Sequence, residues 1–81
     1  METQMATQPH PGTIVYIDGA TQRELSRVAA TEVPETMRFA PTDHGLVPVV
    51  KVETFLDGNK RYVREYGPGG EFLRSTMMVR A

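Results

Sequence analysis

Residues 47–79, which read VPVVKVETFLDGNKRYVREYGPGGEFLRSTMMV, decide the fold. This stretch contains three runs of strand-forming residues, and two turn signals, DGN at 57–59 and GPGG at 67–70, separate them. Glycine and asparagine are the residues that tight hairpin turns favour. The pattern predicts a three-stranded antiparallel meander, and we expect the rest of the chain to cover one face of it.

The register of the first hairpin follows from its charges. A loop centred on residues 58–59 gives the opposed pairs Asp57–Lys60, Leu56–Arg61, Phe55–Tyr62, Glu53–Arg64 and Lys51–Tyr66. A loop centred one residue earlier would bring Lys51 opposite Arg64, which is a like-charge pair. Directly opposed pairs contribute about 0.2–1 kcal/mol each, so the first register is the prediction.

This register gives the meander two unlike faces. One face is aliphatic and carries Val50, Val52, Thr54, Leu56, Val63, Leu73, Ser75, Met77 and Val79. The other is aromatic and basic and carries Lys51, Glu53, Phe55, Tyr62, Arg64, Tyr66, Phe72, Arg74 and Thr76. The third strand depends on a three-residue loop at 68–70, which places Arg64 opposite Arg74. A loop of another length moves Phe72 to the other face.

Upstream of the meander, the pattern predicts a strand and then a short helix. Residues 13–17 are β-branched and aromatic, and Asp18-Gly19 ends this strand. Thr21 and Glu24 have the spacing of a capping box. Apolar residues then recur at helical spacing until Pro34 stops the helix, namely Leu25, Val28 and Ala29.

A hairpin is the alternative for the same segment. In that case Asp18-Gly19 forms the turn and residues 23–29 form a second strand, but alternation would then expose Leu25. The capping box favours the helix. Further along, residues 36–40 alternate enough to predict a short edge strand, with Pro41 to Gly45 as a turn.

The predicted fold class is therefore α+β: one short helix packed on a small antiparallel sheet, in the order β-α-(β)-β-β-β, ending in the meander. We expect residues 1–11 to form a disordered N-terminal tail and residues 12–81 to form a single domain. A chain of 81 residues buries only about 60% of its surface on folding, so a deep catalytic pocket is not expected.

Composition excludes several kinds of site. The chain has no cysteine and only two histidines, one of them in the expected tail, which leaves neither a thiolate zinc site nor a cysteine nucleophile. The GPGG turn lacks the Lys-Ser/Thr that completes a phosphate-binding loop. We expect a protein that is not an enzyme and has no cofactor and no metal.

Charge and hydropathy limit the partners. The net charge is −1, whereas a duplex-DNA binder is normally strongly basic. No apolar run is long enough to span a membrane, and we expect a cytoplasmic protein without a membrane partner. The meander half is the more basic one: residues 49–81 carry +2 and residues 1–48 carry −3.

The open aromatic and basic face is the predicted binding surface. Its candidate residues are Lys51, Phe55, Tyr62, Arg64, Tyr66, Phe72 and Arg74, and a candidate dimer edge comprises Met77, Met78 and Val79. Aromatic residues, methionine and arginine are enriched at protein interfaces, and an edge strand can pair with another strand.

The functional hypothesis is a small non-catalytic protein-binding or adaptor domain that acts through this face or by edge-strand pairing, including pairing into a homodimer. Rings interleaved with cations also bind single-stranded nucleic acid, which gives a first alternative. A second alternative is a small inhibitory protein of phage or plasmid type that occludes a surface.

Overall fold

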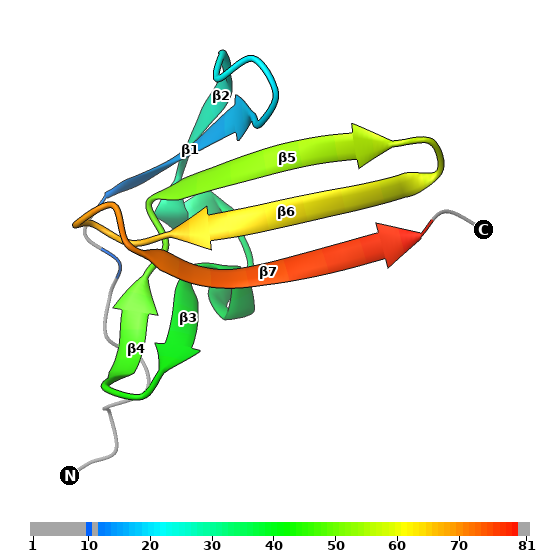
Figure 1. Cartoon of the computed structure of the whole chain (residues 1–81). Coiled ribbons are helices and arrows are strands. Elements are labelled where there is room, and N and C mark those ends of the chain that lie inside the picture. Colours follow the sequence, from blue (N-terminus) through cyan, green and yellow to red (C-terminus); the bar gives the residue numbers. More distant parts are fainter. Residues whose placement is uncertain (1–9, 11, 80–81) are drawn as a thin grey trace, which may run out of the picture.

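Strands form most of the part of the chain that the computed structural model describes, which is residue 10 and residues 12–79 (Figure 1). Seven strands and two short 3-10 turns follow one another: β1 (Thr13–Asp18), β2 (Glu24–Ala29), η2 (Ala30–Glu32), η3 (Glu35–Met37), β3 (Phe39–Thr42), β4 (Gly45–Pro48), β5 (Lys51–Asp57), β6 (Lys60–Tyr66) and β7 (Phe72–Val79). Within these described residues, no helix is long and apolar enough to cross a membrane.

Five strands form one sheet in the order β2-β1-β5-β6-β7, and β3 and β4 form a separate hairpin. β1 runs parallel to β5, and the other neighbours in the large sheet are antiparallel. The expected all-antiparallel sheet is therefore wrong at the β1–β5 contact. The chain between these strands passes through β2, both 3-10 turns and the β3–β4 hairpin before it returns beside β1 (Figure 1).

The predicted α+β fold is wrong, because residues 24–29 form strand β2 and not a helix. β2 pairs antiparallel with β1 through a turn that Asp18 organises. The Asp18 carboxylate accepts hydrogen bonds from the backbone N–H groups of Ala20 (2.8 Å) and Thr21 (3.4 Å), and the Gln22 N–H donates to the Asp18 carbonyl (2.7 Å). This is the turn chemistry of aspartate, and it directs the chain into a hairpin.

The features that predicted the helix have other roles in the hairpin. The Thr21 hydroxyl accepts a hydrogen bond from the Arg23 N–H within the turn, and the Glu24 carboxylate pairs with Arg27 at 2.7 Å. Leu25 is the extra residue of a β-bulge, since Tyr16 opposes Ser26 and Ile17 opposes Glu24. Leu25 is 61% exposed. The hairpin alternative predicts this exposure, which was a reason to prefer the helix.

The meander is confirmed, and all five predicted pairs of its first hairpin occur between β5 and β6. Its predicted start is too early, because Val47 and Pro48 belong to β4, which pairs with β3. The predicted edge strand at residues 36–40 is also displaced. Residues 35–37 form η3, and the strand begins at Phe39.

The predicted register of the second hairpin is wrong. Arg64 opposes Ser75, and Arg74 opposes Glu65, because Leu73 is the extra residue of a bulge in β7. Opposed residues share a face, so the shift exchanges the two sides of β7 from Arg74 onward, while Phe72 stays opposite Tyr66. Ser75, Met77 and Val79 lie on the aromatic face, and Arg74, Thr76 and Met78 lie on the aliphatic one.

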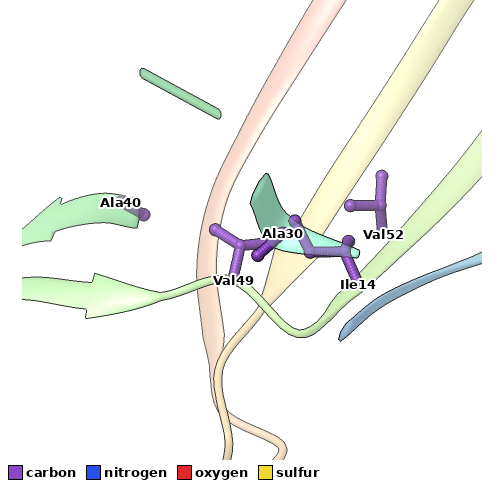
Figure 2. Close-up of a cluster of buried hydrophobic side chains, with 5 residues drawn as sticks. All are labelled: Ile14, Ala30, Ala40, Val49 and Val52. Atoms are coloured by element: carbon purple, nitrogen blue, oxygen red, sulfur yellow. The ribbon is translucent and has the colours of Figure 1, made fainter. Parts of the chain in front are cut away.

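The core fills the side where the helix was expected. Its buried cluster draws on β1, η2, β3, the β4–β5 connection and β5, and Figure 2 shows its members, Ile14, Ala30, Ala40, Val49 and Val52. Four half-buried side chains pack against it: Tyr16, Val33, Val63 and Leu73. A 3-10 turn and the small hairpin therefore cover the aliphatic face near β1.

Residues 1–9 and 11 of the expected N-terminal tail lie outside the described residues. His10 is the residue of this tail that the structure describes. His10 is half-buried, against the expectation of a disordered tail. Its Nε2 lies 2.8 Å from the Val49 carbonyl, its Nδ1 accepts the Gly12 N–H at 3.0 Å, and its ring lies 5.7 Å from that of Phe39. These contacts fix residue 10 beside the core.

Candidate interaction surface

The aromatic face holds six of the seven candidate binding residues. Lys51, Phe55, Tyr62, Arg64, Tyr66 and Phe72 share one side of β5, β6 and β7. Arg74 lies on the opposite side. Its Nη2 lies 2.7 Å from Oε1 of Glu65, which is only 7% exposed, and its Nε donates to the same oxygen at 2.9 Å. Arg74 therefore neutralises a buried carboxylate and does not belong to the predicted binding face.

The other two candidate cations, Lys51 and Arg64, lie over rings of the same face. The guanidinium carbon of Arg64 is 5.1 Å from the centroid of the Phe55 ring, and Nζ of Lys51 is 4.7 Å from that of Tyr66. Phe72 meets Tyr66 edge-on, with centroids 6.0 Å apart. Such cation–π contacts contribute about 0.5–1 kcal/mol each at exposed sites. The rings and cations thus stabilise one another within the sheet.

A buried carboxylate lies among these residues. Glu53 is 8% exposed and accepts hydrogen bonds from the Tyr66 hydroxyl at 2.7 Å and from the Gln22 side-chain amide at 3.0 Å. The Tyr66 hydrogen bond is the main cause that lowers the pKa of Glu53, with smaller contributions from Gln22, Lys51 and Arg64, while burial opposes them. The same hydrogen bond raises the pKa of Tyr66.

This network fastens the β1–β2 turn to the sheet. Gln22 has a φ of 65° and also donates to the Gly19 carbonyl, so its side chain links the turn to Glu53 of β5. The sequence pointed only to Arg64 as the partner opposite Glu53. Gln22 has no signal in the sequence, because its role depends on a hairpin in a segment whose pattern predicts a helix.

Tyr66→Phe is expected to lower the free energy of unfolding by about 1–2 kcal/mol at neutral pH, because a buried carboxylate loses a donor. The folded-state pKa of Glu53 lies below its ordinary value. Its ionised form therefore stabilises the fold above that ordinary value, and this contribution is lost as the pH falls through the folded-state pKa. The Tyr66→Phe variant has less of this stabilisation at neutral pH. The difference in unfolding free energy between the variant and the wild type should therefore shrink as the pH falls. Urea unfolding from neutral to acidic pH measures this, and a difference that is constant with pH would contradict it.

Gly19 lies directly beneath the Phe55 ring. A Cβ atom added at Gly19 would lie 2.3 Å from the ring, whereas nothing lies within 4 Å of one added at Gly12. Gly19→Ala is therefore expected to displace the ring and cost about 1–2 kcal/mol of unfolding free energy. Gly12→Ala is the matched control and should cost much less. Repeating Gly19→Ala in a Phe55→Ala background should remove most of the penalty, and an unchanged penalty there would contradict the ring contact.

The far half of the meander extends beyond β1, and most of its side chains are exposed on both faces. β1 pairs with β5 only as far as Thr54, and the ends of the three strands continue past it (Figure 1). Five large apolar side chains lie there, and we call them the distal surface: Leu25, Leu56, Met77, Met78 and Val79. They are between 47% and 77% exposed.

The distal surface includes a groove on its aliphatic side. Leu25, Leu56 and Met78 line this groove of about 570 Å³, and Lys60 and Arg61 lie beside them. A smaller hollow on the aromatic side is lined by Phe55, Asp57, Tyr62, Arg64 and Ser75. The structure thus brings the predicted edge residues 77–79 together with two leucines that the sequence analysis had placed in a core.

Among the described residues, no group of three or more histidine, cysteine, aspartate or glutamate side chains could hold a metal ion. No protein-family model, curated protein or solved structure matches this chain.

Proposed function

We propose that this protein is a small, non-catalytic protein-binding domain that acts through the distal surface of its meander. The observation that carries the proposal is the exposure of five large apolar side chains at the projecting end of the sheet, namely Leu25 of β2, Leu56 of β5 and residues 77–79 of β7. Contiguous apolar patches on soluble domains mark interaction sites more often than chance exposure does. Methionine adapts to irregular partner surfaces, and residues 77 and 78 supply two.

The cost of leaving this surface in water supports the same conclusion. Each large apolar side chain gains about 1.5–3 kcal/mol when it is fully buried. Burial of five such half-exposed side chains would therefore contribute several kcal/mol to binding. This is large beside the core, because the described residues contain only six buried hydrophobic side chains. A partner that covers the distal surface would recover this energy.

Single-stranded nucleic acid has less support as the partner. Arg74 is engaged with Glu65 on the other face, and Arg64 and Lys51 lie over rings that would have to stack on bases. To bind nucleic acid, these three cations would have to leave their present partners to reach phosphates, and the rings would have to be uncovered to stack on bases.

The test is affinity capture from an extract of the source cells with three immobilised proteins. Leu56→Ser combined with Met78→Ser removes two apolar side chains from the groove, and Leu46→Ser is the control, since Leu46 is 50% exposed on β4. We expect proteins that bind the wild type and the control but not the double variant. Identical capture by all three, or none by any, would overturn the proposal. Salt-sensitive retention of labelled single-stranded oligonucleotide would favour the nucleic-acid alternative.

A further inference from the structure

We infer that the distal surface binds a second copy of this chain, through antiparallel pairing of β7 with β7 about a two-fold axis. This inference rests on the proposed function and specifies its partner. Its starting point is that β7 is at the edge of the five-stranded sheet, after β6. An edge strand presents a row of backbone N–H and C=O groups that an added strand can pair with.

The second half of β7 lacks the devices that protect sheet edges. Proteins block such pairing with charged residues, proline, bulges or very short strands. β7 is eight residues long, its bulge is at Leu73 near the first end, and residues 75–79 include no charged residue, proline or glycine. The described residues cover this half on neither face, as the exposure of Met77 (53%), Met78 (47%) and Val79 (58%) shows.

The two-fold axis determines which residues oppose each other. In antiparallel pairing, opposed residues share a face, so the axis must pass beside one residue and its own copy. We place it at Thr76. Ser75 then opposes Met77 of the second copy on the aromatic face, and Arg74 opposes Met78 on the aliphatic face. Met78 packs along the aliphatic stem of Arg74, whose guanidinium stays with Glu65.

The charges allow this pairing. Residues 75–79 are neutral and Arg74 opposes Met78, so no like charges oppose each other along the paired segment. Among the described residues, the nearest exposed cations are Lys60 and Arg61 on β6. Three strand spacings separate β6 from its copy, which is about 14 Å and longer than the Debye length of about 8 Å at physiological ionic strength. Their mutual repulsion is therefore screened.

The dimer is expected to dissociate on dilution. Pairing along half a strand covers less surface than the roughly 1,200 Å² at which stable interfaces begin, so we expect a dissociation constant on the order of micromolar. Each face still gains contacts between methionines and the opposite strand, and the pairing joins two five-stranded sheets into one.

The absence of cysteine in this chain allows a clean cross-linking test. Residues directly opposed across antiparallel strands have Cα atoms about 4.5–5.5 Å apart, which is within the range for a disulfide. Under mild oxidation, Thr76→Cys should form a covalent dimer in high yield. Leu46→Cys, on the exposed β4, is the control and should form little. A cross-link yield for Thr76→Cys no greater than that of Leu46→Cys would overturn the inference, and preferential cross-linking of Met77→Cys would overturn the register.

Sedimentation equilibrium of the cysteine-free protein gives an independent measurement. The mass should rise from the 9.0 kDa of one chain toward twice that value with concentration. Thr76→Lys puts two cations together at the axis and should weaken association by up to about 5-fold. A monomer at every concentration would overturn the inference. It would leave the capture experiment standing, because Leu56 of the groove variant is on β5, outside the pairing strand.

Discussion

Replacing Ile14 with alanine is expected to lower the free energy of unfolding by about 3 kcal/mol. Ile14 is completely buried on β1 and belongs to the small cluster that joins β1, η2 and β5. Two of the other members are alanines, so little side-chain volume is available to refill the space (Figure 2). Domains of this size are stable by only about 5 kcal/mol or somewhat more, so the variant should be close to unfolding at body temperature.

Chemical denaturation of a graded series measures this effect. Ile14→Val removes one methyl group and should cost about 1 kcal/mol. Leu25→Ala should cost less than about 0.5 kcal/mol, because Leu25 is 61% exposed in its bulge. The predicted helix, with Leu25 on its buried stripe, would instead make the costs of Ile14→Ala and Leu25→Ala similar. Equal costs for Ile14→Ala and Leu25→Ala would therefore contradict the strand assignment of β2.

Replacing Arg74 with methionine is expected to destabilise the protein by about 3 kcal/mol, which is the usual cost of removing one partner from a buried ion pair. Glu65 is 7% exposed and receives two contacts from Arg74. Without them, its carboxylate remains beside Tyr16, whose pKa is raised mainly by burial and further by the Glu65 charge. The folded state would then hold a buried charge that lacks its cation.

The double variant Glu65→Leu with Arg74→Met is the control for that prediction. It removes the buried charge together with its partner, so it should recover most of the lost stability, because apolar pairs often replace buried ion pairs without cost. Thermal unfolding of the two single variants and the double variant gives the coupling energy. Additive effects would mean that the two side chains do not interact, and would contradict the bulged register of β7.

The sequence predicted the parts of the fold that local patterns determine. The first hairpin has a two-residue turn and a charge pattern that only one register satisfies, and the structure has that register. The register of the second hairpin was predicted wrongly, because the bulge at Leu73 has no signature in the residues around it. One extra residue reversed the side of every later side chain, so Arg74 left the predicted face and Met77 joined it.

The helix prediction failed for a different reason. Thr21, Glu24 and the apolar spacing that follows satisfy a helix start locally, but the same residues also satisfy an aspartate-directed hairpin. The outcome depends on pairing with β1 and, through it, on β5, which is far away in the sequence. Exposure of Leu25 disfavours the hairpin in the sequence, whereas in the folded protein the exposed Leu25 lines part of the groove.

The parallel contact between β1 and β5 has a consequence for the order of folding. The β5–β6 and β6–β7 turns join neighbouring residues, but β1 meets β5 only after the chain between residues 18 and 51 has been brought back. Closing a long loop costs entropy before any contact offsets it, and non-local pairing slows folding. We therefore expect the meander to form the nucleus and the β1–β2 hairpin to dock afterwards. Stopped-flow kinetics of Val15→Ala should show faster unfolding with little change in the folding rate, and slower folding instead would reverse this order.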